Sequence, residues 1–203
     1  MGACTSKDGI HEPMVSAFKS ADELQDFATF FPEGKNIKSL LKKNLTEEIW
    51  NEYKDKSCAQ GVSFKTCIFS GIKNLDSGIG VYAGSHDAYK TFNKLFDAII
   101  KDYHGHGPND KHVSEMTSAG LTNVEFSPED AEMIVSTRIR VGRNLDGFPL
   151  GPGVTKEQRL EIMNHVVTAA SMFDEDLKGT FYPLEGMDKK VQKQLIADHF
   201  LFK

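Results

Sequence analysis

A cluster of glycine, proline and small polar residues interrupts the chain after residue 104, and this break constrains the fold more than any other feature. Gly105, Gly107 and Pro108 open the segment, which shows little hydrophobic periodicity. Glycine and proline are unfavourable inside helices and strands, so we interpret residues 106–130 as a linker. The 203 residues are therefore predicted to form two modest domains and not one continuous core.

The spacing of apolar residues before the linker predicts a helical domain over residues 21–105, preceded by a flexible tail over residues 1–20. A capping box at residues 20–23 and a cap at Ser85 mark two expected helix starts. The expected helical stretches are an apolar run at Leu24, Phe27, Phe30 and Phe31, residues 37–45, residues 47–54, and a stripe of Tyr89, Phe92, Phe96, Ile99 and Ile100.

The sequence after the linker predicts a mixed domain over residues 131–203. Residues 133–141 have strand composition, and a second capping box at residues 155–158 opens an amphipathic helix. Another helical pattern covers residues 189–197 and runs into an apolar, strand-like end. The predicted fold class is therefore α+β, and we expect the second domain to be incomplete because that last pattern has neither a turn residue nor a cap.

Composition excludes several classes of function. The formal net charge of −5 argues against a nucleic-acid surface, where clustered positive charge is expected. The three cysteines, Cys4, Cys58 and Cys67, lack metal-ligand spacing and fit a reducing compartment such as the cytoplasm. Cys58 and Cys67 are predicted to be small buried hydrophobic residues.

The N-terminus carries a lipidation pattern. Gly2 follows the initiator methionine, Ser6 has the required small hydroxyl, and Cys4 is a neighbouring palmitoylation candidate. Two acyl chains are what stable anchoring needs, so we expect contact with the inner face of a plasma or flagellar membrane. The alternative is a polar tail that matches the pattern by chance.

The first candidate site is the arginine-bearing segment of residues 136–143. Side chains alternate between the faces of a strand, so Ser136, Arg138 and Arg140 would share one face. Two guanidinium groups roughly 7 Å apart repel each other, but a polyanion such as phosphate would bind both. A solvated strand with two unremarkable arginines is the alternative, and the pattern alone leaves both open.

The second candidate site is the glycine-rich segment of residues 75–82. Its glycines allow a backbone to approach a ligand closely, and Tyr82 offers a ring and a hydroxyl. The segment lacks the lysine and hydroxyl residue that end a Walker phosphate loop. An ordinary surface loop is the alternative interpretation.

Five motifs in order make the chain resemble the phosphagen (ATP:guanido) kinases, most closely those members that phosphorylate arginine. The motifs lie at residues 74–83, 102–105, 136–140, 179–184 and 198–203. The resemblance implies a small helical domain followed by a domain built on an antiparallel sheet. It also implies a monomer that transfers the γ-phosphoryl group of ATP reversibly to L-arginine, with Mg²⁺ held mainly through the nucleotide.

The resemblance also implies roles for individual residues, with no protein ligand to a metal. It assigns substrate binding to Ser77, Gly78, Ile79, Gly80, Val81 and Tyr82, loop stabilisation to Asp76, and nucleotide binding to Ser136, Thr137, Arg138, Ile139, Arg140 and His199. A loop without an insertion between Phe69 and Tyr82 favours arginine over creatine, and taurocyamine stays open. The bacterial protein-arginine kinases resemble only the second domain, so the helical first domain counts against them.

The sequence departs from the family pattern in what lies beyond Lys203. The catalytic acidic residue, the reactive cysteine and the further phosphate-binding arginines of the family would follow this position. The partner expected for Asp76 is also absent from the sequence. We therefore expect a fragment that is inactive alone, and a truncated, non-catalytic module is the alternative function.

Overall fold

A computed structural model describes residues 14–120, 126–135, 137 and 140–201. These residues form two compact units, one extending to Val154 and the other beginning at Thr155. The predicted domain boundaries after residues 105 and 130 stay predictions. No helix among the described residues is long and apolar enough to cross a bilayer.

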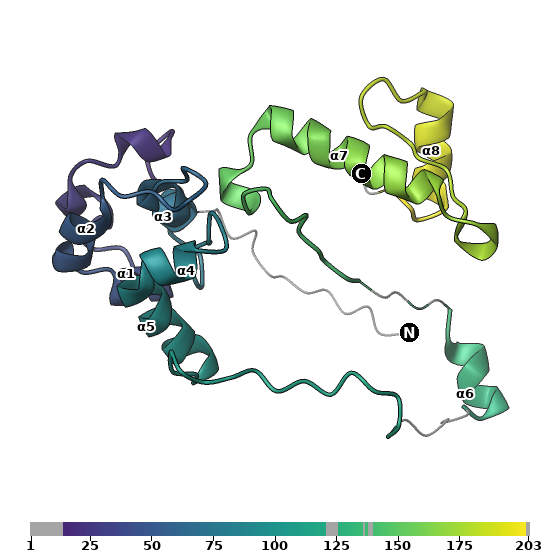
Figure 1. Cartoon of the computed structure of the whole chain (residues 1–203), viewed down its shortest axis with the longest axis horizontal. Coiled ribbons are helices and arrows are strands. Elements are labelled where there is room, and N and C mark those ends of the chain that lie inside the picture. The colour runs from purple at the N-terminus through teal and green to yellow at the C-terminus, as the bar shows by residue number, and fades with distance from the viewer. Residues whose placement is uncertain (1–13, 121–125, 136, 138–139, 202–203) are drawn as a thin grey trace, which may run out of the picture. The chain divides into compact units, whose positions relative to one another are not determined.

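The first unit contains a bundle of short helices, drawn in purple to teal in Figure 1, and the elements that follow the bundle in sequence up to Val154. Its elements are the 3₁₀ turns η1 (Ala21–Glu23), η2 (Phe27–Thr29) and η3 (Gly151–Gly153), and the helices α1 (Leu40–Asn44), α2 (Glu47–Tyr53), α3 (Phe64–Lys73), α4 (Ala88–Thr91), α5 (Asn93–His104) and α6 (Pro128–Met133).

The helices α1, α2 and α3 each begin at a hydroxyl side chain. Ser39, Thr46 and Ser63 accept a hydrogen bond from the backbone N–H three residues further on. These bonds satisfy amides that have no partner within the helix, which is why serine and threonine favour this position. The sequence therefore fixes where the three helices start, and with them the direction of the chain through the bundle.

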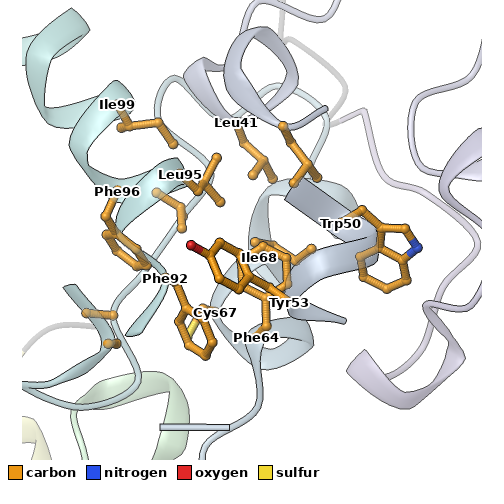
Figure 2. Close-up of a cluster of buried hydrophobic side chains, with 14 of the residues drawn as sticks. Leu41, Trp50, Tyr53, Phe64, Cys67, Ile68, Phe92, Leu95, Phe96 and Ile99 are labelled. Atoms are coloured by element: carbon orange, nitrogen blue, oxygen red, sulfur yellow. The ribbon is translucent and has the colours of Figure 1, made fainter. Parts of the chain in front are cut away.

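Aromatic side chains fill the core between these helices. Figure 2 shows Tyr53, Phe64 and Phe92 at the centre of the cluster, with Trp50 at one side. The rings of Phe64 and Phe92 lie 5.1 Å apart between centroids, and those of Phe30 and Trp50 lie 4.8 Å apart. Edge-on and tilted packing at these distances adds to the stabilisation from burial alone.

Two sequence predictions for the bundle are confirmed and two need correction. The predicted stretches of residues 47–54 and 37–45 contain α2 and α1, respectively. The predicted capping box at residues 20–23 is wrong: Ser20 makes no side-chain cap bond, and the Glu23 carboxylate instead accepts from the backbone N–H of Lys19. The helix predicted over the apolar run that follows is also wrong, because the run contains only the short 3₁₀ turn η2, although Leu24 and Phe30 are fully buried.

The helix predicted to start at Ser85 is divided into α4 and α5. Ser85 donates its hydroxyl hydrogen to the carboxylate of Asp87, which also accepts from the backbone N–H of Ala59. The first hydrogen bond, followed by the second, lowers the pKa of Asp87. The apolar stripe is confirmed for Phe92, Phe96 and Ile99, which lie in the core, and for Ile100, which packs against it, whereas Tyr89 is exposed.

The strand predicted at residues 133–141 is wrong for the residues that the structure describes. Met133 is the last residue of α6, whose start combines a Ser127 cap with Pro128 at the first helical position. Residues 134, 135, 137, 140 and 141 have no strand partner. Within the described residues, β-pairing is limited to two isolated bridges, Val15 with Asn74 and Ser57 with Ser63, so the expected antiparallel sheet is not shown.

The second unit contains α7 (Lys156–Ser171), the turn η4 (Glu175–Leu177) and α8 (Lys189–Ala197). The predicted capping box at Thr155 and Gln158 is confirmed, with both reciprocal hydrogen bonds present. Residues 189–197 form α8 as predicted. The strand-like end is wrong for residues 199–201, because His199 has a φ of 62° and the amides of Phe200 and Leu201 bond back to Leu195.

Candidate functional site

The glycine-rich segment forms an irregular loop between α3 and α4. The segment begins at Asn74, the C-cap of α3, and a turn follows in which the Ser77 amide donates to the Asn74 carbonyl over 3.1 Å. Leu75 is fully buried and fixes the start of the loop in the core. We call residues 74–82 the glycine loop.

The first turn of α1 holds the backbone of the glycine loop. The amides of Leu40 and Leu41 donate to the carbonyls of Gly78 and Ile79, each over 2.9 Å. Amides at the start of a helix have no partner within it, so the loop carbonyls satisfy donors that would otherwise need solvent. Two consecutive hydrogen bonds therefore fix the position of the loop relative to α1.

Helix α3 holds the loop from a second side. The Tyr82 amide donates to the carbonyl of Cys67 over 2.9 Å. The backbone of Gly80 passes so close to Gly71 that a Cβ built on Gly71 would lie 2.2 Å from the Gly80 oxygen. Gly80 thus packs against Gly71 of α3, whereas a Cβ on Gly78 would meet no atom within 4 Å.

The loop exposes some of its side chains while its backbone is held. Ile79 is 37% exposed and Tyr82 is 55% exposed, whereas Gly80 and Val81 are buried. A hollow of about 190 Å³ lies beside the exposed pair, lined mainly by apolar and aromatic residues of the loop, of α5 and of their surroundings: Ile79, Val81, Tyr82, Ala83, Tyr89, Phe96, Ile99, Ile100, Tyr103 and His104. The arrangement can contact the aliphatic part of a small ligand while polar groups remain at the rim.

An ion pair joins α1 to α5 beside this hollow. Lys43 Nζ lies 2.9 Å from Asp102 Oδ2, and the Asn44 side-chain amide donates to the same oxygen over 2.9 Å. The Lys43 ammonium, followed by the Asn44 amide, lowers the pKa of Asp102. The pair holds the helix that carries the loop contacts against the helix that forms the wall of the hollow.

Asp76, predicted to stabilise the loop, is exposed and has no hydrogen-bond or ion-pair partner among the described residues. Its turn is formed by the backbone of Asn74 and Ser77 instead. The role of Asp76 therefore stays a prediction.

The buried cysteines do not supply a nucleophile to the loop. Cys67 on α3 is fully buried, and burial raises the pKa of its thiol to about 11. Cys58 is also buried, and its thiol donates to the carbonyl of Val62 over 3.1 Å. Both cysteines are the small buried residues that the sequence predicted, and a neutral thiol is a poor nucleophile.

The structure describes only part of the predicted nucleotide site. Ser136, Arg138 and Ile139 lie outside the described residues, as do Gly2 and Cys4 of the lipidation pattern. Thr137 and Arg140 are exposed, and Arg140 has no acidic partner within the described part of the chain. His199 is exposed in the second unit. No group of described residues has the composition and proximity to hold a metal ion.

The sequence interpretation missed α3, which supplies two of the contacts to the loop. A signal was present: Ser63 has the character of a helix cap, and Phe64, Cys67, Ile68 and Ile72 follow at helical spacing. The contact between Gly71 and Gly80 gave no comparable signal, because a glycine within an apolar pattern does not reveal what packs against it.

Comparison with known families identifies the domain that carries the glycine loop. The sequence profile of the ATP:guanido phosphotransferase N-terminal domain matches residues 35–101. This range includes α1, α2, α3, the whole glycine loop and most of α5. Every hydrogen bond described above between the loop and the helices lies within the matched range.

Curated relatives match almost all of the chain. The arginine kinase of Limulus polyphemus is 44% identical over 183 residues, which are 90% of this chain and 51% of that protein. Arginine kinase Lit v 2.0101 of Penaeus vannamei is 46% identical over 195 residues, which are 96% of this chain and 52% of that protein. The chain thus spans about half the length of these relatives.

Solved structures of two related enzymes share the fold. A lombricine kinase superposes with a TM-score of 0.71 and 30% identity, over 85% of this chain and 47% of that one. The duplicated taurocyamine kinase of Schistosoma mansoni superposes with a TM-score of 0.69 and 32% identity, over 84% of this chain and 24% of that one.

Proposed function

We propose that the chain belongs to the ATP:guanido phosphotransferase family, whose N-terminal domain matches residues 35–101, and that it forms the guanidino-substrate part of an arginine kinase. The reaction is the reversible transfer of the γ-phosphoryl group of ATP to a guanidino nitrogen of L-arginine. One observation carries the proposal: the glycine loop is held by hydrogen bonds to α1 and α3, and it exposes side chains beside a hollow of small-molecule size.

This chain contributes to the reaction by positioning the guanidino substrate. Phosphoryl transfer needs the attacking and leaving groups in line, and alignment alone can lower a barrier by about 7–11 kcal/mol. The backbone bonds of Gly78, Ile79 and Tyr82 keep the loop in place before substrate arrives. The half-buried Ser77 and the exposed Ile79 and Tyr82 side chains then hold the amino-acid end of arginine, so that its guanidino group extends away from the loop.

The nucleotide is the second substrate, and members of this family use ATP with Mg²⁺. The chemistry of the available donors fits phosphate, because Arg140 exposes a guanidinium group that has no acidic partner among the described residues. We assign Arg138 and Arg140 to the phosphates, with Ser136, Thr137, Ile139 and His199 around the nucleotide. The Mg²⁺ ion is held mainly through the nucleotide.

A kinase of another guanidino compound is the second candidate. Its support is the superposition on a taurocyamine kinase and a lombricine kinase. The identity to the arginine kinases is higher, at 44–46% against 30–32%, and the short glycine loop favours a large substrate. We therefore prefer arginine.

A fusion enzyme can test which guanidino compound is the substrate. Residues 1–203 are joined to the part of the Limulus polyphemus arginine kinase that follows its matched region, and the product is assayed with MgATP. L-arginine, taurocyamine, lombricine and creatine are compared at equal concentrations, with the parent kinase as the control. We expect the highest kcat/KM for L-arginine. A folded fusion that prefers creatine, or that transfers phosphate to none of the four, contradicts the proposal.

Membrane anchoring is a separate proposal that depends on the tail alone. We propose that Gly2 is myristoylated and Cys4 palmitoylated, because a single chain binds membranes weakly and reversibly. The test is fractionation of cells that express the full chain with a C-terminal fluorescent protein. Both Gly2→Ala and Cys4→Ser should move the protein from the membrane to the soluble fraction. An unchanged distribution in Gly2→Ala rules out the anchor.

A further inference from the structure

Gly71 is an unexpected residue in the middle of α3. Glycine is less favourable than alanine in a helix interior, because it loses more conformational freedom when the helix forms. The position is buried, and an added Cβ would lie 2.2 Å from the oxygen and 2.5 Å from the Cα of Gly80. The missing side chain therefore makes room for the backbone of the glycine loop.

Gly80, the other residue of this contact, also lacks space for a side chain. Its φ of 84° lies in the left-handed region that side chains disfavour. A Cβ at this position would also lie 3.1 Å from the Leu41 Cβ and 3.2 Å from the Gly71 Cα. The backbone of the loop thus passes between α1 and α3 at a point where neither Gly71 nor Gly80 has space for a side chain.

The glycine contact lies between the hydrogen bonds that hold the loop. Gly78 and Ile79, just before Gly80, accept from the first turn of α1, and Tyr82, just after it, donates to α3. A shift of the Gly80 backbone away from α3 would change all of these distances together. The distance between the loop backbone and α3 therefore depends on the Gly71–Gly80 contact, and the bonds to both helices depend on that distance.

We propose that Gly71 is a positioning residue for the guanidino substrate, acting through its backbone contact with Gly80. A side chain at residue 71 displaces Gly80, weakens the bonds from Leu40 and Leu41, and moves the side chains of Ser77, Ile79 and Tyr82 together. The assignment of those side chains to the substrate rests on the proposed function. The contact itself, and its effect on the loop bonds, does not.

The test on the 203-residue chain is backbone amide hydrogen exchange followed by NMR, on the wild type, Gly71→Ala and a matched control. Gly120→Ala is the control, because a Cβ at residue 120 meets no atom within 4 Å. In the wild type, the Leu40 and Leu41 amides should be protected about 100-fold or more over free amides. Gly71→Ala should lower that protection at least about tenfold and leave the Trp50 amide of α2 unchanged.

The test of substrate positioning uses the fusion enzyme with the same substitutions. Gly71→Ala should raise KM for L-arginine about tenfold or more, while the Kd for MgADP changes less than about twofold. Gly120→Ala should change neither. Rates that fall without a change in KM, or a parallel loss of MgADP binding, would assign Gly71 a purely structural role and overturn the proposal.

The outcomes separate this inference from the proposed function. If Gly71→Ala lowers the protection of the Leu40 and Leu41 amides in the 203-residue chain, but the fusion enzyme phosphorylates no guanidino compound, the loop contact stands and the arginine kinase is rejected. Unchanged protection in Gly71→Ala, with normal turnover, rejects the contact and keeps the kinase. If Gly71→Ala does not fold, the amide exchange of the wild-type chain still tests the proposal. Unprotected Leu40 and Leu41 amides in the wild type would overturn it.

Discussion

At the residue scale, burial determines what the side chain of Cys67 can do. The thiol is fully buried, and burial raises its pKa to about 11. At pH 8, only about one thiol in a thousand is ionised, and the thiolate is the reactive form. The stabilising effect of the buried neutral thiol is present below the pKa of an unfolded cysteine and is lost as the pH rises toward 11.

Alkylation with iodoacetamide at pH 8, in a Cys4→Ser background, measures the reactivity of the Cys67 thiol directly. We expect Cys67 to stay unmodified in the folded chain and to react fully in concentrated urea, with peptide mass spectrometry identifying the modified residue. Raising the pH toward 11 should increase its reactivity and lower the free energy of unfolding. Rapid modification of folded Cys67 at pH 8 would show that the thiol is accessible and ionised.

Arg140 is the second residue whose role can be measured alone. Each charge-assisted bond to phosphate contributes about 1.5–3 kcal/mol, so Arg140→Ala in the fusion enzyme should raise the Kd for MgADP about 10- to 150-fold. Arg143→Ala is the matched control, because its guanidinium donates to the carbonyl of its neighbour Gly142. Calorimetric titration gives both values. An equal Kd in the two variants would favour the alternative that Arg140 is a solvated side chain that does not bind phosphate.

At the element scale, α3 stabilises both the core and the glycine loop. Phe64→Ala removes a fully buried ring between Tyr53 and Phe92, and such truncations cost about 3–5 kcal/mol. Urea unfolding can be followed by the fluorescence of Trp50, the one tryptophan of the sequence. Phe126→Ala, at a ring that is 65% exposed, should change the midpoint little. Similar midpoints for the two variants would mean that the core is packed differently.

The start of α7 offers a second measurement at this scale. Thr155→Ala removes the cap bond to the Gln158 amide and should destabilise the helix by about 1 kcal/mol, whereas Thr155→Ser keeps the hydroxyl. Amide exchange in the first turn of α7 should therefore accelerate in the alanine variant alone. Equal acceleration in both variants would show that the methyl group, and not the hydrogen bond, matters.

Elements with local signals could be predicted from the sequence, and those that depend on distant partners could not. The cap at Thr155 and the apolar stripe of α5 are local patterns, and both were found. Residues 133–141 have strand composition, but a strand forms only with a paired neighbour, and α6 takes the first of these residues instead. The glycine loop was located by its motif, whereas its bonds to Leu40 and Leu41 join residues 38 positions apart.

At the scale of the whole molecule, we expect these 203 residues to supply only part of each proposed site. The described residues contain the glycine loop and an exposed Arg140, but the chain spans about half the length of its relatives. We expect residues 1–203 alone to show no transfer of phosphate from ATP to arginine in a coupled assay, because alignment needs both substrates held at once. Robust turnover by the 203-residue chain would require new catalytic groups among its own residues. The monomeric state stays a prediction.

We propose above all that the glycine loop binds the guanidino substrate, and hydrogen exchange of the fusion enzyme tests this binding most directly. Mass spectrometry compares the peptide that covers residues 74–82 in MgADP alone, with L-arginine added, and with agmatine added. Agmatine lacks the carboxylate that the loop should contact. We expect this peptide to exchange more slowly with L-arginine, and to change less with agmatine. An enzyme that turns over arginine while residues 74–82 exchange at the same rate in all three conditions would contradict the proposal.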